Sequence, residues 1–99
     1  MDIKNKIIVV TGAGAGIGKA LAICFAKQGA KRVICSDIDA IKSKETADLI
    51  DGVSIEADVS KEADLINLIA QSEAEIGPID LFCSNAGILN QAGLDGNQN

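Results

Sequence analysis

A glycine-rich segment between an apolar run and a helical pattern limits most strongly what this chain can fold into. Residues 9–18 are VVTGAGAGIG, with a glycine at every second position from Gly12 to Gly18. The apolar run at residues 7–10 predicts a buried strand, and the apolar periodicity that begins at Ile17 predicts a helix. A strand, a glycine-rich turn and a helix in this order are typical of a phosphate-binding βα junction.

The glycines suit that role for physical reasons. A turn this tight needs backbone angles that glycine adopts without strain, and a bulky side chain would hold a pyrophosphate away from the backbone. The helix that follows offers unpaired N–H groups and the positive end of its dipole to an anion. A glycine pattern alone is a weak signal, so a flexible glycine turn within a βα unit is the alternative.

Composition and missing residue types restrict the class of protein. The chain has 99 residues and a net charge of −5, which predicts one small domain and argues against nucleic-acid or anionic-membrane partners. We find no signal peptide and no apolar run of transmembrane length. The absence of His, Tyr and Trp excludes histidine base chemistry, histidine metal ligation and a tyrosine acid–base, and we predict no metal site.

The three cysteines give an expectation about compartment. Cys24, Cys35 and Cys83 lie far apart, in or beside apolar runs, and none forms a C-x-x-C. Buried, reduced thiols are expected, which predicts a cytoplasmic protein. A reactive or metal-binding role for one of these cysteines is the alternative.

The rest of the chain alternates predicted strands and helices. Strands are expected at residues 3–10, 32–36, 53–57 and 79–84, and helices at about 17–28, 40–50 and 61–76. Right-handed crossovers then give a parallel sheet with strand order 3-2-1-4, an incomplete doubly wound Rossmann-type α/β fold. The expected apolar helix faces are Ile17, Ala20, Leu21, Cys24 and Phe25, then Ile41, Ala47 and Ile50, then Leu65, Ile66, Ile69 and Ile76.

Asp37 follows the second expected strand, 19 residues beyond Gly18. This spacing matches an acidic residue that accepts hydrogen bonds from the adenosine ribose of a dinucleotide. Its charge would repel a 2′-phosphate, and no Lys or Arg stands at position 38 or within residues 12–18, so we predict NAD rather than NADP. The alternative is a turn or capping aspartate, although Asp39 is the better candidate for a cap.

Two further groups come to the same edge of the expected sheet. Asp58 and Val59 follow the third strand, where they could reach an adenine ring; helix-start chemistry, with Ser60 as the N-cap, is an equal alternative. The triplet Asn-Ala-Gly at residues 85–87 follows the fourth strand. Strand order 3-2-1-4 places a switch point between strands one and four, where ligands bind outside the carboxyl ends.

With these residues together, the chain resembles the short-chain dehydrogenase/reductase family over residues 3 to about 90. Thr11, Gly12, Gly16 and Gly18 match the family's T-G-x-x-x-G-x-G, Asp37 its NAD-selecting position, Asp58 and Val59 its adenine pair, and Asn85, Ala86 and Gly87 the end of its N-N-A-G. Ser84 replaces the first Asn of that motif, which puts a sheet-supporting hydrogen bond in doubt and not the cofactor site.

The resemblance implies hydride transfer between NAD(H) and a carbonyl or alcohol substrate. The cofactor contacts expected from the residues and the resemblance are Thr11, Gly12, Gly14, Ala15, Gly16, Ile17, Gly18, Asp37, Asp58, Val59, Asn85, Ala86 and Gly87. The family's catalytic Asn, Ser and Y-x-x-x-K lie further on and cannot be placed here, so we expect no catalytic residue and no turnover in this chain. A substrate is expected only for a longer form.

The resemblance predicts the N-terminal half of such an enzyme: an incomplete domain at residues 1–90 and a polar tail at 91–99. Strand four would then be an open sheet edge, so we expect marginal stability and pairing with other copies or aggregation. One alternative is a stand-alone NAD-binding module with a regulatory or partner-binding role. Another is a methyltransferase-like or flavin-binding Rossmann domain, which the triplet at 85–87 makes hard to support.

Overall fold

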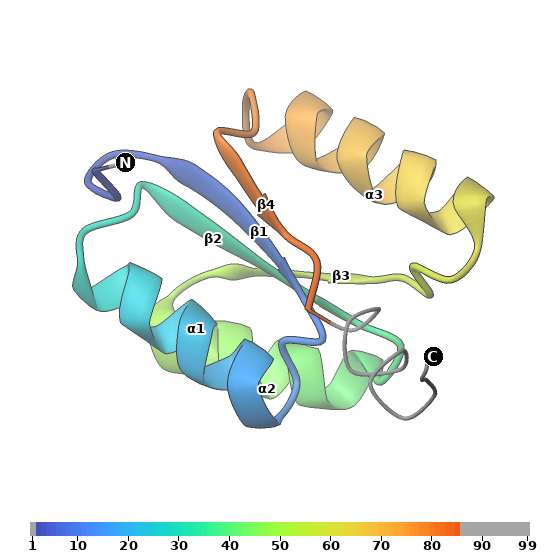
Figure 1. The fold of residues 1–99 in the computed structure, drawn as a ribbon, viewed down its shortest axis with the longest axis horizontal. Helices are drawn as coiled ribbons and strands as arrows, with labels where there is room; N and C mark the ends of the chain where they lie inside the picture. Colours follow the sequence, from blue (N-terminus) through green and yellow to red (C-terminus); the bar gives the residue numbers. More distant parts are fainter. Residues whose placement is uncertain (1, 86–99) are drawn as a thin grey trace, which may run out of the picture.

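A computed structural model describes residues 2–85 of the chain, which form a parallel sheet with helices on both faces (Figure 1). In chain order the elements are β1 (Ile7–Thr11), α1 (Gly16–Lys27), β2 (Arg32–Asp37), α2 (Ala40–Ile50), β3 (Val53–Glu56), α3 (Glu62–Glu75) and β4 (Leu81–Cys83). The strands lie in the order β3-β2-β1-β4. The predicted Rossmann-type fold class and strand order are confirmed.

The parallel register brings the carboxyl ends of the strands to one edge, which we call the rim. Thr11 at the end of β1 pairs with Ser36 of β2, and Asp37 at the end of β2 pairs with Glu56 at the end of β3. β4 pairs with β1 on the other side and ends at Cys83. Each segment that leaves a strand at its carboxyl end therefore starts from the rim.

The sheet is buried on both faces at its centre. α1 and α2 lie on one face, over a core that includes Ile8 and Val10, while α3 lies on the other, over Val9 and Ile34 (Figure 1). Every residue of β1 is buried. This confirms the prediction that the first strand is covered on both sides, as in parallel sheets generally.

α2 packs on the sheet largely through small residues, and of the expected apolar stripe Ala47 and Ile50 face the core while Ile41 does not. Ile41 is 73% exposed, whereas Ser43, Thr46 and Ala47 are buried. Only Ala47 of the expected stripe is fully buried, and Ile50 is half-buried. Small side chains bring the helix axis close to the strands, and hydropathy does not predict that use of serine and threonine.

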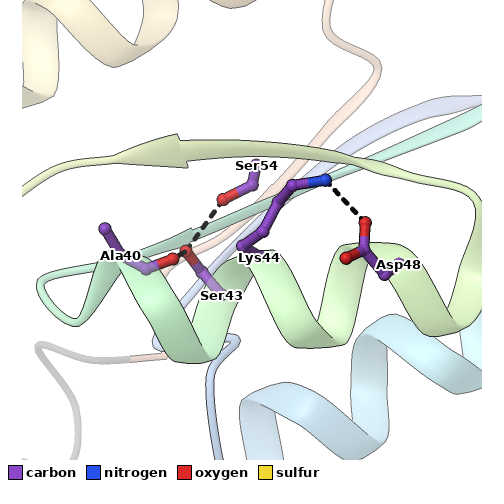
Figure 2. A network of polar contacts seen from close by, with 5 residues as sticks. All are labelled: Ala40, Ser43, Lys44, Asp48 and Ser54. Atoms are coloured by element: carbon purple, nitrogen blue, oxygen red, sulfur yellow. Dashed lines mark hydrogen bonds and ion pairs between the residues drawn. The ribbon is translucent and has the colours of Figure 1, made fainter.

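A hydrogen bond between hydroxyl groups joins α2 to β3 (Figure 2). The Oγ atoms of Ser43 and Ser54 lie 2.9 Å apart, and Ser43 Oγ also lies 3.2 Å from the Ala40 carbonyl oxygen, to which it can donate. On the exposed side of the same helix, Lys44 pairs with Asp48 at 2.6 Å. The buried Ser43 hydroxyl is thus satisfied where the helix meets the strand, whereas the buried Thr46 Oγ1 of the same helix has no hydrogen-bond partner within residues 2–85.

The faces of the other two helices also differ from expectation. In α1 the expected positions Ile17, Ala20 and Cys24 are exposed, and only Leu21 and Phe25 pack against the core. The fully buried positions of this helix are the small residues Gly18 and Ala22. The helix is therefore turned toward its smallest side chains, which allow the closest approach to β1.

α3 is rotated in a similar way relative to its expected face. Leu68 and Ser72 are its fully buried residues, whereas Ile66 is 61% and Ile69 is 37% exposed. Leu65 is half-buried, so that the true face runs through 65, 68 and 72 at helical spacing. Of the expected face, Leu65 and Ile76 are half-buried and Ile76 packs against the core, whereas Ile66 and Ile69 are exposed.

The prediction of buried thiols holds for Cys35, holds partly for Cys83 and is wrong for Cys24. Cys35 is buried, Cys83 is half-buried and Cys24 is exposed on α1. Burial raises the pKa of the Cys35 thiol to about 11 and also raises the pKa of Cys83. Both of these thiols are therefore protonated and poorly nucleophilic at neutral pH.

Within residues 2–85 there is no helix long and apolar enough to cross a membrane. β4 forms one edge of the four described strands, as the sequence led us to expect. The predicted tail at residues 91–99 and the domain boundary at residue 90 lie outside the described residues.

Candidate functional site

The glycine loop, residues 12–18, joins β1 to α1, and its glycines meet two different needs. Gly12 and Gly16 have positive φ angles of 68° and 57°, a conformation that other residues reach only with strain. Gly14 and Gly18 are needed for space. A Cβ at Gly18 would lie 2.1 Å from the Gly12 carbonyl oxygen, and a Cβ at Gly14 would lie 2.9 Å from Asp37 Oδ2. The loop is therefore a closely packed turn and not a flexible connection.

α1 begins at this loop without a capping side chain from residues 2–85. Its N-cap residue is Ala15, and its first turn contains no acidic residue. The first N–H groups and the positive end of the helix dipole are therefore not neutralised by a side chain of this part of the protein. A Cβ at Gly16 would meet nothing within 4 Å, so the space outside the turn is open to a ligand.

Asp37 ties the end of β2 to the glycine loop. Its Oδ2 accepts a hydrogen bond from the Gly14 N–H at 2.9 Å, and its Oδ1 accepts one from the Asp39 N–H at 3.0 Å. A carboxylate offers about four lone-pair positions, so Asp37 keeps acceptor capacity for two ribose hydroxyls. The capping role expected of Asp39 is confirmed, because its Oδ1 accepts from the Lys42 N–H at 3.1 Å.

Asn85 closes the rim on the β4 side of the glycine loop. Its N–H donates to Thr11 Oγ1 at 3.0 Å, and the Thr11 hydroxyl donates to the Cys83 carbonyl oxygen at 3.3 Å. Asn85 is 8% exposed, and its Nδ2 lies 3.1 Å from the position of a Cβ at Gly18. Within the described residues this buried Nδ2 has no hydrogen-bond acceptor. A buried amide without an acceptor is a group that a ligand oxygen could satisfy.

Ala86 and Gly87, which the sequence places in the same triplet, lie outside the described residues. The other expected contacts lie at the rim, either as the last residue of a strand or on the segment that follows one. The strand ends are Thr11 and Asp37, and the following segments hold Gly12, Gly14, Ala15, Gly16, Ile17, Gly18, Asp58, Val59 and Asn85. Ile17 is 59% exposed at the start of α1.

Asp58 and Val59 leave β3 at the rim, where Asp58 organises a local turn. Its Oδ1 accepts hydrogen bonds from Ser60 Oγ at 2.6 Å and from the Ser60 N–H at 3.0 Å, and these bonds lower the pKa of the Asp58 carboxyl. The Asp58 N–H donates to Asp64 Oδ2 at 2.9 Å. The N-cap of α3 is Lys61, so the expected cap at Ser60 is wrong. Val59 packs against the core on the α3 face.

Lys42 lies beside Gly14 and Asp37, and it was not identified from the sequence. A Cβ at Gly14 would lie 2.8 Å from Lys42 Cβ, so the side chain of Lys42 starts against the glycine loop. It is the third residue of α2, one turn after the Asp39 cap. The search for cations covered position 38 and residues 12–18, and it therefore missed Lys42. Extending the search for Lys and Arg to the first turn of α2 would have found it.

A second concave surface lies at the opposite end of the strands. It encloses about 450 Å³ and is lined by Lys31, Arg32, Asp51, Gly52, Val53, Glu75 and Ile76. Arg32 and Val53 are the first residues of β2 and β3, so this groove is separated from the rim by the length of the sheet. It holds charges of both signs and none of the residues that the sequence predicts to contact a cofactor.

The rim fits a dinucleotide in the chemistry of its groups. Close glycine backbone and an uncapped helix N-terminus suit a pyrophosphate. An acidic residue at the end of the neighbouring strand suits an adenosine ribose. The orphaned Asn85 Nδ2 marks a further polar contact on the β4 side. The glycine loop after β1 and Asn85 after β4 flank the point at which the strand order reverses, and Asp37 lies at the end of the neighbouring β2.

Comparison with known proteins gives a consistent family. A family model described as short chain dehydrogenase matches residues 6–98. An uncharacterized oxidoreductase of Thermotoga maritima is 40% identical over 94 residues, which are 90% of this chain and 36% of that protein. A short-chain dehydrogenase/reductase homolog of Bacillus subtilis, YusS, is 34% identical, and the match covers 96% of this chain and 92% of YusS. The chain thus spans about a third of the Thermotoga relative.

Solved structures resemble the chain over most of its described length. A hydroxysteroid dehydrogenase from Escherichia coli superposes with a TM-score of 0.78 at 37% identity, covering 86% of this chain and 38% of that protein. A Brucella melitensis structure described as ribose-5-phosphate isomerase gives a TM-score of 0.81 at 32% identity, covering 86% and 33%. The two descriptions differ in reaction, which shows that fold alone does not specify chemistry.

Proposed function

Because the chain belongs to the short-chain dehydrogenase family, we propose that it provides the cofactor-binding part of an NAD-dependent oxidoreductase. Bound NAD(H) would supply or accept the hydride exchanged with a carbonyl or alcohol substrate. The oxidoreductase and dehydrogenase names of similar proteins support this reaction class.

The hydrogen bond between Gly14 and Asp37 is the observation that carries this proposal. It joins the glycine loop to the acidic end of β2, which are the two parts that must be adjacent to hold one adenosine diphosphate unit. In the proposed complex the backbone of residues 15–18 binds the pyrophosphate and Asp37 accepts from the ribose. Asp58 and Val59 border the adenine, and residues 85–87 border the inner ribose.

The preference for NAD over NADP rests on the charge of Asp37. A carboxylate accepts hydrogen bonds from the two ribose hydroxyls, whereas it repels a phosphate at the 2′ position. Asp39 adds a second carboxylate to the same turn. We therefore expect the site to bind NADH more tightly than NADPH.

No residue of this chain is proposed to carry out the chemical step. The chain contains no Tyr to act as an acid or base toward a substrate hydroxyl or carbonyl. We expect cofactor binding by the purified chain without measurable turnover.

Titration of the purified chain with NADH, followed by calorimetry and by the fluorescence of the reduced nicotinamide, tests the proposal. Saturable binding at one site per chain is expected, and Asp37→Ala should weaken it. Asp48→Ala is the matched control, because Asp48 is an exposed aspartate that pairs with Lys44 away from the rim. A folded chain that binds neither NADH nor NADPH would contradict the proposal.

A further inference from the structure

The side chain of Lys42 begins at the corner formed by Gly14 and Asp37. A Cβ placed at Gly14 would lie 2.8 Å from Lys42 Cβ and 2.9 Å from Asp37 Oδ2, so both side chains border the same point of the glycine loop. The Gly14 N–H donates to that same Asp37 oxygen. Lys42 is therefore the lysine whose stem adjoins the carboxylate that is proposed to bind the ribose.

The positive charge of Lys42 is not neutralised in the described part of the chain. Within residues 2–85 the ion pair that the structure forms joins Lys44 to Asp48, and Lys44 stands two residues after Lys42 on α2. Lys42 is exposed, and its backbone N–H, not its ammonium, contacts the Asp39 carboxylate. A lysine ammonium on a flexible four-carbon stem can move toward an anion that enters this corner.

We propose that Lys42 moderates the preference for NAD(H) set by Asp37, by binding the 2′-phosphate of NADP(H) beside that carboxylate. This inference rests on the proposed function, since it assigns one residue of the same cofactor site. Asp37 favours the free ribose hydroxyls and repels the phosphate, while Lys42 attracts it. The two residues therefore oppose each other, and the site discriminates less against NADP(H) than Asp37 alone would make it do.

Calorimetric titrations with NADH and NADPH of the purified chain and of Lys42→Ala test the assignment. Lys42→Ala should weaken NADPH binding by about threefold to fivefold, the effect of removing one exposed charge partner of a phosphate. NADH binding should change by less than about twofold, because the ribose hydroxyls need no cation. Raising the salt concentration should reduce the NADPH effect, since salt screens exposed charges.

Lys44→Ala is the matched control, because Lys44 is an exposed lysine on the same helix. It should leave the ratio of NADPH to NADH affinity unchanged. Asp37→Ser gives a second measurement: it should improve NADPH binding relative to NADH, and adding Lys42→Ala should remove most of that improvement. Where NADPH binds too weakly for calorimetry, adenosine 2′,5′-bisphosphate and adenosine 5′-monophosphate replace the two cofactors, with NMR as the readout.

The possible outcomes separate the role of Lys42 from the existence of the cofactor site. Equal effects of Lys42→Ala on both cofactors, or no effect on either, would overturn the role of Lys42 while leaving the cofactor site in place. If the folded wild-type chain bound neither cofactor, the proposed function itself would be wrong, and the assignment of Lys42 would be overturned with it.

Discussion

Two carboxylates at the rim, Asp37 at the end of β2 and Asp58 two residues beyond the end of β3, are held by different parts of the structure. Asp37 accepts from the Gly14 N–H, across 23 residues of sequence, and thereby couples β2 to the glycine loop. Asp58 accepts both of its hydrogen bonds from Ser60, two residues further on. One carboxylate is built into the junction of two segments, and the other shapes the turn in which it stands.

The difference shows why spacing alone does not assign a ligand contact. Both aspartates follow a strand and precede a helix, so both fit either a binding role or a capping role. Asp37 has a separate residue, Asp39, to cap α2, and this leaves its own carboxylate directed at the loop. No such second aspartate frees Asp58 within the turn at residues 58–61. We therefore expect the ribose corner to contribute more to cofactor affinity than the adenine corner.

The largest effect is expected from Gly14→Val, which attacks the ribose corner directly. Even the first side-chain carbon would lie 2.8 Å from Lys42 Cβ and 2.9 Å from Asp37 Oδ2. The branched side chain must displace Asp37 or the start of α2, so we expect loss of NADH binding by at least about 100-fold and a lower melting temperature. Calorimetry and thermal unfolding measure both effects. Wild-type affinity in this variant would show that the corner is not part of the site.

A smaller effect is expected from Asp37→Ala. The variant removes the acceptors for the ribose hydroxyls and for the Gly14 N–H, and we expect NADH binding to weaken by roughly 1–3 kcal/mol. NADPH binding should weaken less, because the repulsion of the 2′-phosphate is removed at the same time. Parallel titrations with both cofactors check the prediction. Equal losses for the two would mean that Asp37 acts only by holding the loop.

Asp58→Ala should change NADH affinity by less than about fivefold, as expected for a partly exposed side chain that serves a local turn. Its effect is to be compared with that of Asp37→Ala under the same conditions. A loss as large as that of Asp37→Ala would break the proposed contrast between the two corners and assign Asp58 a direct contact with the adenine.

The smallest effect concerns pH. Hydrogen bonds from Ser60 hold the pKa of Asp58 below its ordinary value in the folded chain. A lowered folded-state pKa means that this turn contributes stability above the unfolded pKa of about 3.9 and loses it as pH falls through the lower folded value. Ser60→Ala should raise the pKa of Asp58, which carboxyl-carbon NMR titration measures. An unchanged midpoint would show that the hydroxyl bond does not form in solution.

The order of elements and the strand order were predictable because glycine, strand and capping signals are local. The helix bounds agree within about one residue of those expected, as for α2 at residues 40–50. The buried faces were not predictable in the same way. Ser43, Thr46 and Ser72 are buried where close helix–sheet contact needs small side chains, while the larger Ile41 and Ile66 are exposed. Hydropathy alone would predict that the isoleucines are buried and that the serines and the threonine are exposed.

In the candidate site, too, some features were predictable from the sequence and others were not. The sequence predicted which segments meet at the rim, because parallel strands with this order place their carboxyl ends together. It did not predict the Asp37–Gly14 hydrogen bond or the approach of Lys42 to Gly14, since both depend on how α2 leaves β2. It also left the two roles of Asp58 equal, and the structure shows that this carboxylate accepts a hydrogen bond from the Ser60 hydroxyl.

Amide chemical shifts of the ¹⁵N-labelled chain during an NADH titration locate the cofactor site residue by residue. We expect saturable shifts at Gly12, Gly14, Gly16, Gly18 and Asp37, with small shifts at the groove around Arg32 and Gly52. Saturable shifts confined to that groove, with the glycine loop unaffected, would contradict the assignment of the rim as the cofactor site.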